Sequence, residues 1–155
     1  EGDNTKVINL IKSIQKTAEE ESDDPYLIEL SERAQQVQDN YEDRQETTQQ
    51  ALNDLLKLLE ENKKRKQEQE AKGFDGLTYF VYGQLIDNGI SDPDATAKEI
   101  KKIFVENPNW RSSDEDYREV RQSIILKLYA ELDEPDEVAH IVDEMLRLLS
   151  KTKNK

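Results

Sequence analysis

Two groups of ionisable residues have spacings that occur in metal or catalytic sites. The first is Glu137 and His140, a Glu-x-x-His pair. Di-iron helical bundles use this spacing to place two ligands on one helix face. Such a site needs two of these pairs, and His140 is the only histidine in the chain. We therefore interpret both residues as lying on the surface of a helix and predict no metal ligand.

The second group is Asp94 followed by Glu99 and Lys101, whose order resembles the acidic and lysine residues of a restriction nuclease site. In such a site these residues lie on adjacent β-strands around a metal ion. The segment "PDATAKEIKKIF" instead has the spacing of one helix, around which Asp94 and Glu99 project roughly 140° apart. The side chains therefore do not converge, and we predict no nuclease chemistry for this segment.

The other common signatures of a catalytic or cofactor site are missing. The chain has no cysteine, so it can form neither a disulfide framework nor a thiolate metal site. It contains no glycine-rich loop followed by Lys-Ser or Lys-Thr, which would bind phosphate, and no serine pattern near His140 suggests a nucleophilic triad. We predict no catalytic residue, no cofactor-binding residue and no enzymatic activity for these 155 residues.

The chain is strongly acidic, with 35 acidic and 22 basic residues, a net charge of −13 and a pI near 4.6. Surfaces that bind duplex DNA are usually basic, so we expect no direct contact with nucleic acid. We interpret the basic run Lys63–Lys66 as the solvated end of a helix. No apolar run reaches the roughly 18 residues that span a bilayer, and together with the absence of cysteine this favours a cytoplasmic protein.

The first predicted domain, residues 1–72, consists of two helices. Apolar residues at helical spacing predict a first helix over residues 5–20. Pro25 suits the start of a second helix, and no glycine or proline follows it before Gly73. We therefore predict one long, coiled-coil-like helix over residues 25–72, roughly 70 Å in length, whose first half packs on the first helix. Its stripe of residues in 3-4 alternation is Leu27, Leu30, Ala34, Val37, Tyr41, Arg44, Thr48, Ala51, Leu55 and Leu58.

The middle of this long helix, "EDRQETTQQ", is poor in apolar residues. We expect it to bend or to be solvated on all sides, with the weakest packing around Thr47–Gln50. A stable loop of several residues at this place would contradict the single helix.

The second predicted domain, residues 73–150, is a compact bundle of about four helices, and a frayed tail follows over residues 151–155. Helix starts are indicated at Asp75, Pro93 and Pro135, because aspartate caps helices and proline suits their first turn. The β-branched residues recur at helical spacing and not in alternation, so the fold class is all-α.

Four residues of the second domain are candidate core anchors or interface residues. Phe80 and Tyr82 lie in "GLTYFVYGQLID", a helix that is apolar nearly all round, which indicates burial on more than one side. Trp110, the only tryptophan, lies in the connection "VENPNWRSSDE" with Arg111 beside it. It either closes over the core or forms a docking spot with Arg111. We expect the inward arrangement.

Two stretches, "NKKRKQEQEAKGFDGLTYFVYGQLIDNG" and "NPNWRSSDEDYREVRQSIILKLYAEL", resemble the C-terminal region of the R (restriction) subunits of type I restriction–modification enzymes. In that family a helix rich in Leu and Lys leads into a Gly-Phe-Asp turn and an aromatic helix. A Trp-Arg-Ser segment then precedes an Arg-rich helix. The matching residues here are Gly73-Phe74-Asp75, Leu77 to Leu85, Trp110-Arg111-Ser112, Arg118 and Arg121. The resemblance covers about residues 24 to 149.

The resemblance implies a specific role. The R subunit is an ATP-driven DNA translocase with a nuclease domain, a type I site-specific deoxyribonuclease, and its catalytic motifs belong to earlier domains. Its C-terminal helical part is expected to dock the motor onto the methyltransferase and specificity subunits. This chain would then be an assembly domain of a bacterial cytoplasmic enzyme, with those subunits and the remainder of the R subunit as its partners.

Three other functions follow from the residues without the resemblance. The first alternative is an unrelated helical coiled-coil adaptor or scaffold module. An isolated enzyme ranks below it because no site is assembled, and an acidic mimic of DNA ranks last. Helicase motifs upstream in the same gene would separate the R subunit from the adaptor.

Overall fold

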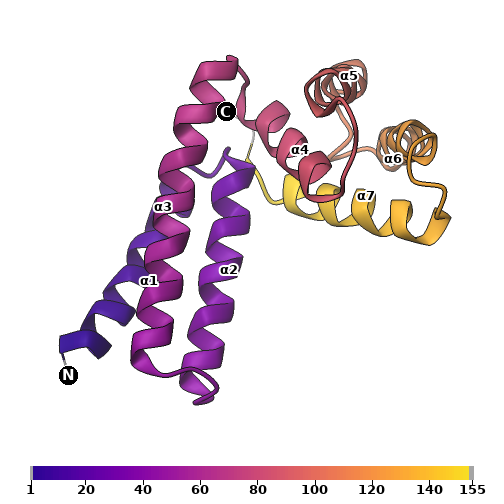
Figure 1. The fold of residues 1–155 in the computed structure, drawn as a ribbon. Helices are drawn as coiled ribbons and strands as arrows, with labels where there is room; N and C mark the ends of the chain where they lie inside the picture. The colour runs from indigo at the N-terminus through magenta and orange to yellow at the C-terminus, as the bar shows by residue number, and fades with distance from the viewer. Residues whose placement is uncertain (1, 154–155) are drawn as a thin grey trace. The chain divides into compact units, whose positions relative to one another are not determined.

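The computed structural model describes residues 2–153, and its regular structure is helical throughout, which confirms the all-α class. The described residues form the helices α1 (Gly2–Glu20), α2 (Pro25–Glu42), α3 (Thr48–Lys72), α4 (Gly76–Asp87), α5 (Pro93–Glu106), α6 (Asp114–Tyr129) and α7 (Pro135–Ser150) (Figure 1). None of the described helices is long and apolar enough to cross a membrane. The chain divides into two compact units, with α1–α3 in the first and α4–α7 in the second.

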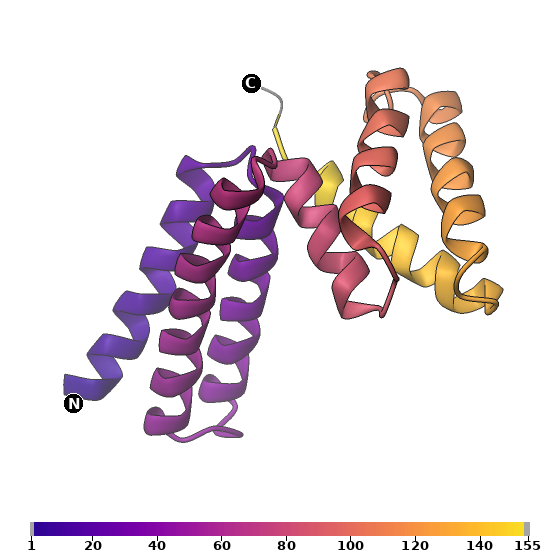
Figure 2. The ribbon, with the colours of Figure 1, turned by 45° about the horizontal axis from the view of Figure 1, so that its top comes forward.

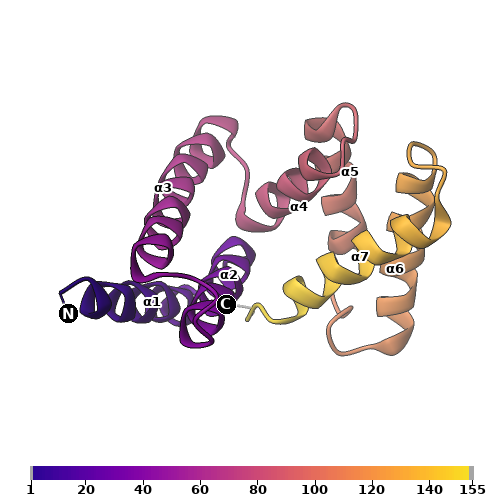
Figure 3. The same ribbon diagram turned by 60° about the horizontal axis from the view of Figure 1, so that its bottom comes forward.

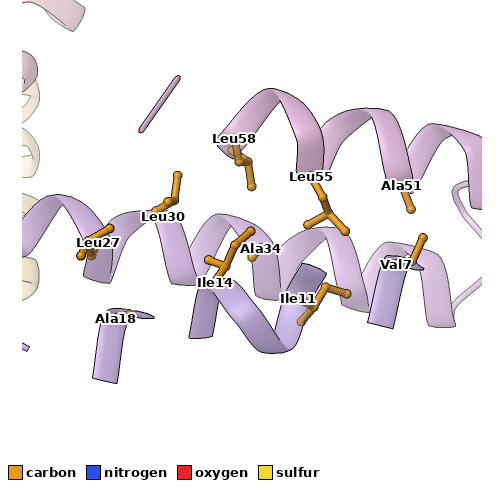
Figure 4. Packing of buried hydrophobic residues seen from close by; sticks show 10 residues of the cluster. All are labelled: Val7, Ile11, Ile14, Ala18, Leu27, Leu30, Ala34, Ala51, Leu55 and Leu58. Atoms are coloured by element: carbon orange, nitrogen blue, oxygen red, sulfur yellow. The ribbon is translucent and has the colours of Figure 1, made fainter. Parts of the chain in front are cut away.

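The first unit consists of three helices that each pack against the other two. They run in alternating directions, so that α1 and α3 are both antiparallel to α2 (Figure 1). One face of each helix is apolar, and the three faces share a core (Figure 4). The buried side chains of this core are Val7, Ile11, Ile14, Ala18, Leu27, Leu30, Ala34, Ala51, Leu55 and Leu58.

The prediction of a single long helix over residues 25–72 is wrong. Its two ends are placed as expected, at Pro25 and Lys72, but the chain leaves the helix after Glu42 and re-enters it at Thr48. Arg44 adopts a left-handed backbone conformation with φ of 59°. The Thr47 side chain then accepts a hydrogen bond from the N–H of Gln50 and begins α3. The poorly apolar middle segment is therefore a turn between two antiparallel helices.

Burial of the second half of the apolar stripe explains this break. In a continuous helix Ala51, Leu55 and Leu58 would extend beyond α1 and face water. The turn brings them against α1 and α2, where all three are buried. Burying one leucine side chain contributes roughly 1.5–3 kcal/mol, which outweighs the cost of a turn. Figure 4 shows the side chains of Ala51, Leu55 and Leu58 on α3 pointing toward the buried residues of α1 and α2.

The second unit consists of α4–α7, and each helix packs against its neighbour in the chain, while α7 also contacts α4. The helices α5 and α6 run side by side (Figure 2), and α7 passes across α6 (Figures 1 and 3). The helix α7 contributes the largest set of buried residues in the unit. Its inward residues are Val138, Ile141, Val142, Met145, Leu146, Leu148 and Leu149.

The C-terminal tail differs from the frayed segment predicted over residues 151–155. Thr152 is buried, and the backbone N–H of Lys153 donates a hydrogen bond of 3.0 Å to the carbonyl oxygen of Ser22. Both of these tail residues belong to the first unit. Residues 154 and 155 lie outside the described part of the chain.

Candidate functional site

The first pair of candidate residues, Phe80 and Tyr82, lies on α4. Asp75 caps this helix, because its carboxylate accepts a hydrogen bond of 2.8 Å from the N–H of Thr78. Both aromatic side chains are buried. The ring of Tyr82 meets the ring of Phe74 edge-on, with centroids 5.8 Å apart, and lies 5.7 Å from the ring of Tyr79. Aromatic contacts of this kind stabilise beyond their buried area, so these residues act as structural anchors.

The start of α4 is also tied to α5. The ammonium group of Lys101 on α5 lies 2.8 Å from the carboxylate of Asp75. Burial alone would raise the pKa of Asp75, but the hydrogen bonds from Lys101 and Thr78 outweigh it and lower the pKa. The carboxylate therefore stays ionised and serves two helices at once.

The second pair of candidates starts with Trp110, which is only 2% exposed. Its backbone N–H donates a hydrogen bond to the carbonyl oxygen of Asn107, which turns the chain after α5. The indole ring meets the ring of Phe104 edge-on at 5.3 Å and lies 6.4 Å from the ring of Tyr117. Trp110 thus packs inward, between residues of α5 and α6.

Arg111 covers the outer side of this tryptophan. Its guanidinium group lies 4.4 Å from the centre of the Trp110 ring, a cation–π contact. One nitrogen also donates to the carbonyl oxygen of Leu149, at 3.4 Å, in the last turn of α7. A cation at this end of a helix is favoured by the helix dipole. Burial lowers the pKa of Arg111.

The four candidate residues therefore do not form one site. Trp110 and Arg111 form one contact, and Phe80 and Tyr82 belong to a different helix. Three of the four are buried. Their arrangement offers packing and charge, with no reactive group held near another.

The three residues whose order resembles a nuclease site do not converge on one point. Asp94, Glu99 and Lys101 all lie on α5. Glu99 pairs with Lys127 of α6, whereas Lys101 pairs with Asp75. The acid and the lysine therefore point to opposite neighbours of α5.

The Glu-x-x-His pair is likewise placed on the surface. Glu137 and His140 are both exposed on α7. Over residues 2–153 no group of three or more His, Cys, Asp or Glu side chains is arranged to hold a metal ion.

Arg65 corrects the interpretation of the basic run as a solvated helix end. The other members of the run are exposed, but Arg65 is only 5% exposed. Its guanidinium lies 2.7 Å from the carboxylate of Asp24 and 4.5 Å from the centre of the Tyr26 ring. It also donates 2.8 Å hydrogen bonds to Asn62 and Gln69 of its own helix. The sequence contains a signal for this burial, because Arg65 lies seven residues after Leu58 and therefore continues the apolar stripe by one heptad.

Exposed apolar side chains on α6 are the second feature that the sequence pattern did not predict. Leu126 is 65% exposed and Tyr129 is 43% exposed, and they lie one turn apart on the face opposite the buried Ile124 and Leu128. Exposed Gln122 precedes them by one turn on the same face. We call these three residues (Gln122, Leu126 and Tyr129) the outer α6 face.

The comparisons with known proteins identify no relative, since no protein-family model, curated protein or solved structure matches the chain.

Proposed function

We propose that the chain is a helical assembly domain and that it docks an R subunit of a type I restriction enzyme onto the methyltransferase and specificity subunits. The observation that carries the proposal is the outer α6 face. Leu126 and Tyr129 expose apolar surface on a chain whose charged residues make up 37% of the total. Exposed apolar side chains that lie together and are surrounded by polar residues are typical of protein interfaces.

The residues that carry the resemblance support this assignment, because they build the fold and leave the outer α6 face open. Gly73 ends α3 with φ of 68°, a left-handed conformation that favours glycine. Asp75 caps α4, and Trp110 fills the core of the second unit. Arg121 forms a bidentate pair with Asp143 of α7, with N–O distances of 2.6 and 3.1 Å. These contacts hold the helices of the second unit in fixed positions, and a docking surface on α6 requires such a rigid support.

The proposal assigns no chemistry to these residues. ATP hydrolysis and DNA cleavage would reside in other domains of the R subunit, and this chain would hold them at the DNA-reading core. The acidic charge suits contact with a basic protein surface and disfavours direct contact with phosphate. The bacterial cytoplasm is the compartment that this function requires.

A binding experiment tests the proposal. The chain is titrated, by calorimetry, into the methyltransferase–specificity complex encoded in the same operon. We expect saturable binding, weakened at least about tenfold by Leu126→Glu, because a charge would be buried against an apolar partner surface. The matched control is Val105→Glu on α5, since Val105 is 62% exposed and lies outside the outer α6 face.

The possible results separate the proposal from its alternative. Equal losses in the two variants would remove the outer α6 face from the proposal. Absence of binding, together with a gene that carries no helicase motifs upstream of these residues, would reject the R-subunit assignment. The alternative, an unrelated helical adaptor, would then be favoured by any other partner whose binding Leu126→Glu abolishes.

A further inference from the structure

The helices α4 and α5 end in the same way, on an asparagine. At the end of α4, the side-chain nitrogen Nδ2 of Asn88 donates a hydrogen bond of 2.7 Å to the carbonyl oxygen of Gln84. At the end of α5, Nδ2 of Asn107 donates one of 2.9 Å to the carbonyl oxygen of Ile103. The last carbonyl groups of a helix lack a partner within that helix, so each asparagine side chain satisfies one of them.

The residue that follows the asparagine differs between the two helix ends. Gly89 follows Asn88, and no other asparagine in the chain precedes a glycine, whereas Pro108 follows Asn107. The side-chain carbon Cγ of an asparagine is open to attack by the backbone nitrogen of the next residue. Glycine has no Cβ to hinder this approach, and proline has no N–H with which to react. Of the two asparagines, Asn88 alone therefore has a reactive neighbour.

We propose that Asn88 is a site of spontaneous deamidation, which the fold prevents and which proceeds when the connection between α4 and α5 (residues 88–92) opens. The Gly89 nitrogen forms a bond to Cγ of Asn88 and gives up its proton. The bond from Cγ to Nδ2 breaks, so that Nδ2 leaves as ammonia. Water then adds to either carbonyl of the resulting cyclic imide and leaves aspartate or isoaspartate at position 88. The reaction needs no reagent besides water.

In the folded chain both reacting groups are engaged in other hydrogen bonds. The N–H of Gly89 donates to the carbonyl oxygen of Ile86, at 3.1 Å, and the carboxamide of Asn88 caps α4. Ile90, the next residue, is only 5% exposed and anchors the backbone on this side. The Gly89 nitrogen can reach Cγ of Asn88 only after both hydrogen bonds are released. The reaction therefore requires a local opening of the chain.

A carboxylate from a distant part of the chain holds the other end of this connection. Both oxygens of Glu131, which lies between α6 and α7, accept hydrogen bonds from Ser91. Oε1 accepts from the hydroxyl at 3.0 Å, and Oε2 accepts from the backbone N–H at 3.2 Å. Both residues are exposed, so water competes for these bonds and their net contribution is modest. We expect Glu131 to slow the reaction at Asn88 by making the open state of the connection rarer.

Deamidation would change the end of α4 permanently. A carboxylate at position 88 can only accept hydrogen bonds, so it cannot donate to the carbonyl oxygen of Gln84. A negative charge at the C-terminus of a helix is also unfavourable, and Asp87 already carries one there. The reaction would thus convert a transient opening of the connection into a lasting one.

Peptide mass spectrometry of the full chain tests the site. The chain is incubated at mildly alkaline pH, which favours attack by the backbone nitrogen, both folded and in guanidinium chloride. We expect conversion at Asn88 in denaturant and a rate at least about tenfold lower in the folded chain, because two hydrogen bonds must open together. Asn107 should stay unconverted in both conditions. Equal rates at Asn88 with and without denaturant, or conversion of Asn107 as fast as that of Asn88, would overturn the proposal.

Three variants test the role of Glu131. Glu131→Ala removes both acceptors, and Ser91→Ala removes the hydroxyl donor from the opposite side. In the folded chain each should accelerate conversion at Asn88, by at least about threefold for Glu131→Ala. The matched control is Asp133→Ala, which removes an exposed carboxylate from the same connection between α6 and α7. In denaturant all three variants should react at the rate of the unaltered chain. Folded-state rates that are equal in Glu131→Ala and Asp133→Ala would refute the role of Glu131.

The variant Asn88→Asp tests the consequence, because it carries one product of the reaction from the start. Hydrogen exchange should show protection of the Gly89 and Ile90 amides lowered at least about threefold. The Trp110 amide, which donates to the carbonyl oxygen of Asn107 at the end of α5, should keep its protection. Unchanged protection of Gly89 and Ile90 would contradict a lasting opening of the connection.

Discussion

Replacing Arg65 by methionine should destabilise the first unit by about 3 kcal/mol. The substitution keeps most of the apolar stem and removes the charge. It leaves the carboxylate of Asp24 facing an apolar side chain, and it removes the stacking on Tyr26. Asp24 retains its other role, since it still accepts a hydrogen bond of 3.1 Å from the N–H of Tyr26 at the start of α2.

The magnitude follows from the burial of the pair. Removing one partner of a buried ion pair costs about 3–5 kcal/mol. The Arg65 side chain is 4% exposed, but that of Asp24 is 17% exposed, so water can partly solvate the remaining charge. This places the cost at the lower end of the range. A unit of this size has a stability of about 4–11 kcal/mol, so the substitution would remove a large share of it.

The assay must separate the two units. Trp110 is the only tryptophan and belongs to the second unit, so its fluorescence reports the unfolding of α4–α7. Urea unfolding followed by circular dichroism reports both units. In Arg65→Met we expect the circular dichroism transition to move to lower urea, while the fluorescence transition stays in place. Hydrogen exchange of the Leu55 and Leu58 amides should identify the destabilised helix.

Two control variants test the reasoning. Asp24→Asn keeps an N-cap acceptor and leaves a buried guanidinium without its anion, so it should cost nearly as much as Arg65→Met. Arg33→Met removes a more exposed pair, whose N–O distance to Glu61 is 3.0 Å, and should cost no more than about 1 kcal/mol. If the Arg65 and Arg33 variants lose the same stability, burial does not decide the strength of these pairs and our reasoning is wrong.

Four further predictions concern the second unit and its boundary. Trp110→Ala should cost roughly 3–5 kcal/mol, as for other large core truncations, measured by thermal unfolding of the second unit; a loss below 1 kcal/mol would assign Trp110 to an interface. Its fluorescence should be blue-shifted and shielded from quenchers, and a red-shifted emission would contradict the 2% exposure. Gly73→Ala should cost about 1–2 kcal/mol because φ is 68°, even though nothing lies within 4 Å of the added carbon; an unchanged urea midpoint would show that the turn relaxes. The purified chain with ATP, Mg²⁺ and duplex DNA should show no turnover, and activity that disappears in Lys101→Met would reverse the interpretation of α5.

The sequence determined the helical class and most helix ends, because these depend on local chemistry. Pro25, Pro93 and Pro135 begin helices as their fixed φ and missing N–H predict. Asp75 caps α4 with its own carboxylate, and Gly73 ends α3 in the conformation that glycine adopts at least cost. Each of these features is set within a few residues of chain, so no distant contact was needed to predict it.

Tertiary structure decided whether the long apolar stripe belongs to one continuous helix or to two antiparallel helices. The 3-4 alternation from Leu27 to Leu58 fits one continuous helix and two antiparallel helices equally well, because both keep the same side chains on one face. The two arrangements differ in what covers Ala51 and Leu55. Only the turn at residues 43–47 buries them, and no local signal records that gain in buried area.

The same limit applies to the charged and exposed residues. The buried Arg65 and the exposed lysines of its run are alike in sequence, and they differ because Asp24 and Tyr26 are brought to one of them from α2. Leu126 is a strongly apolar residue that the fold leaves exposed. Composition and spacing state what a side chain can do, whereas its burial and its partners depend on residues distant in the chain.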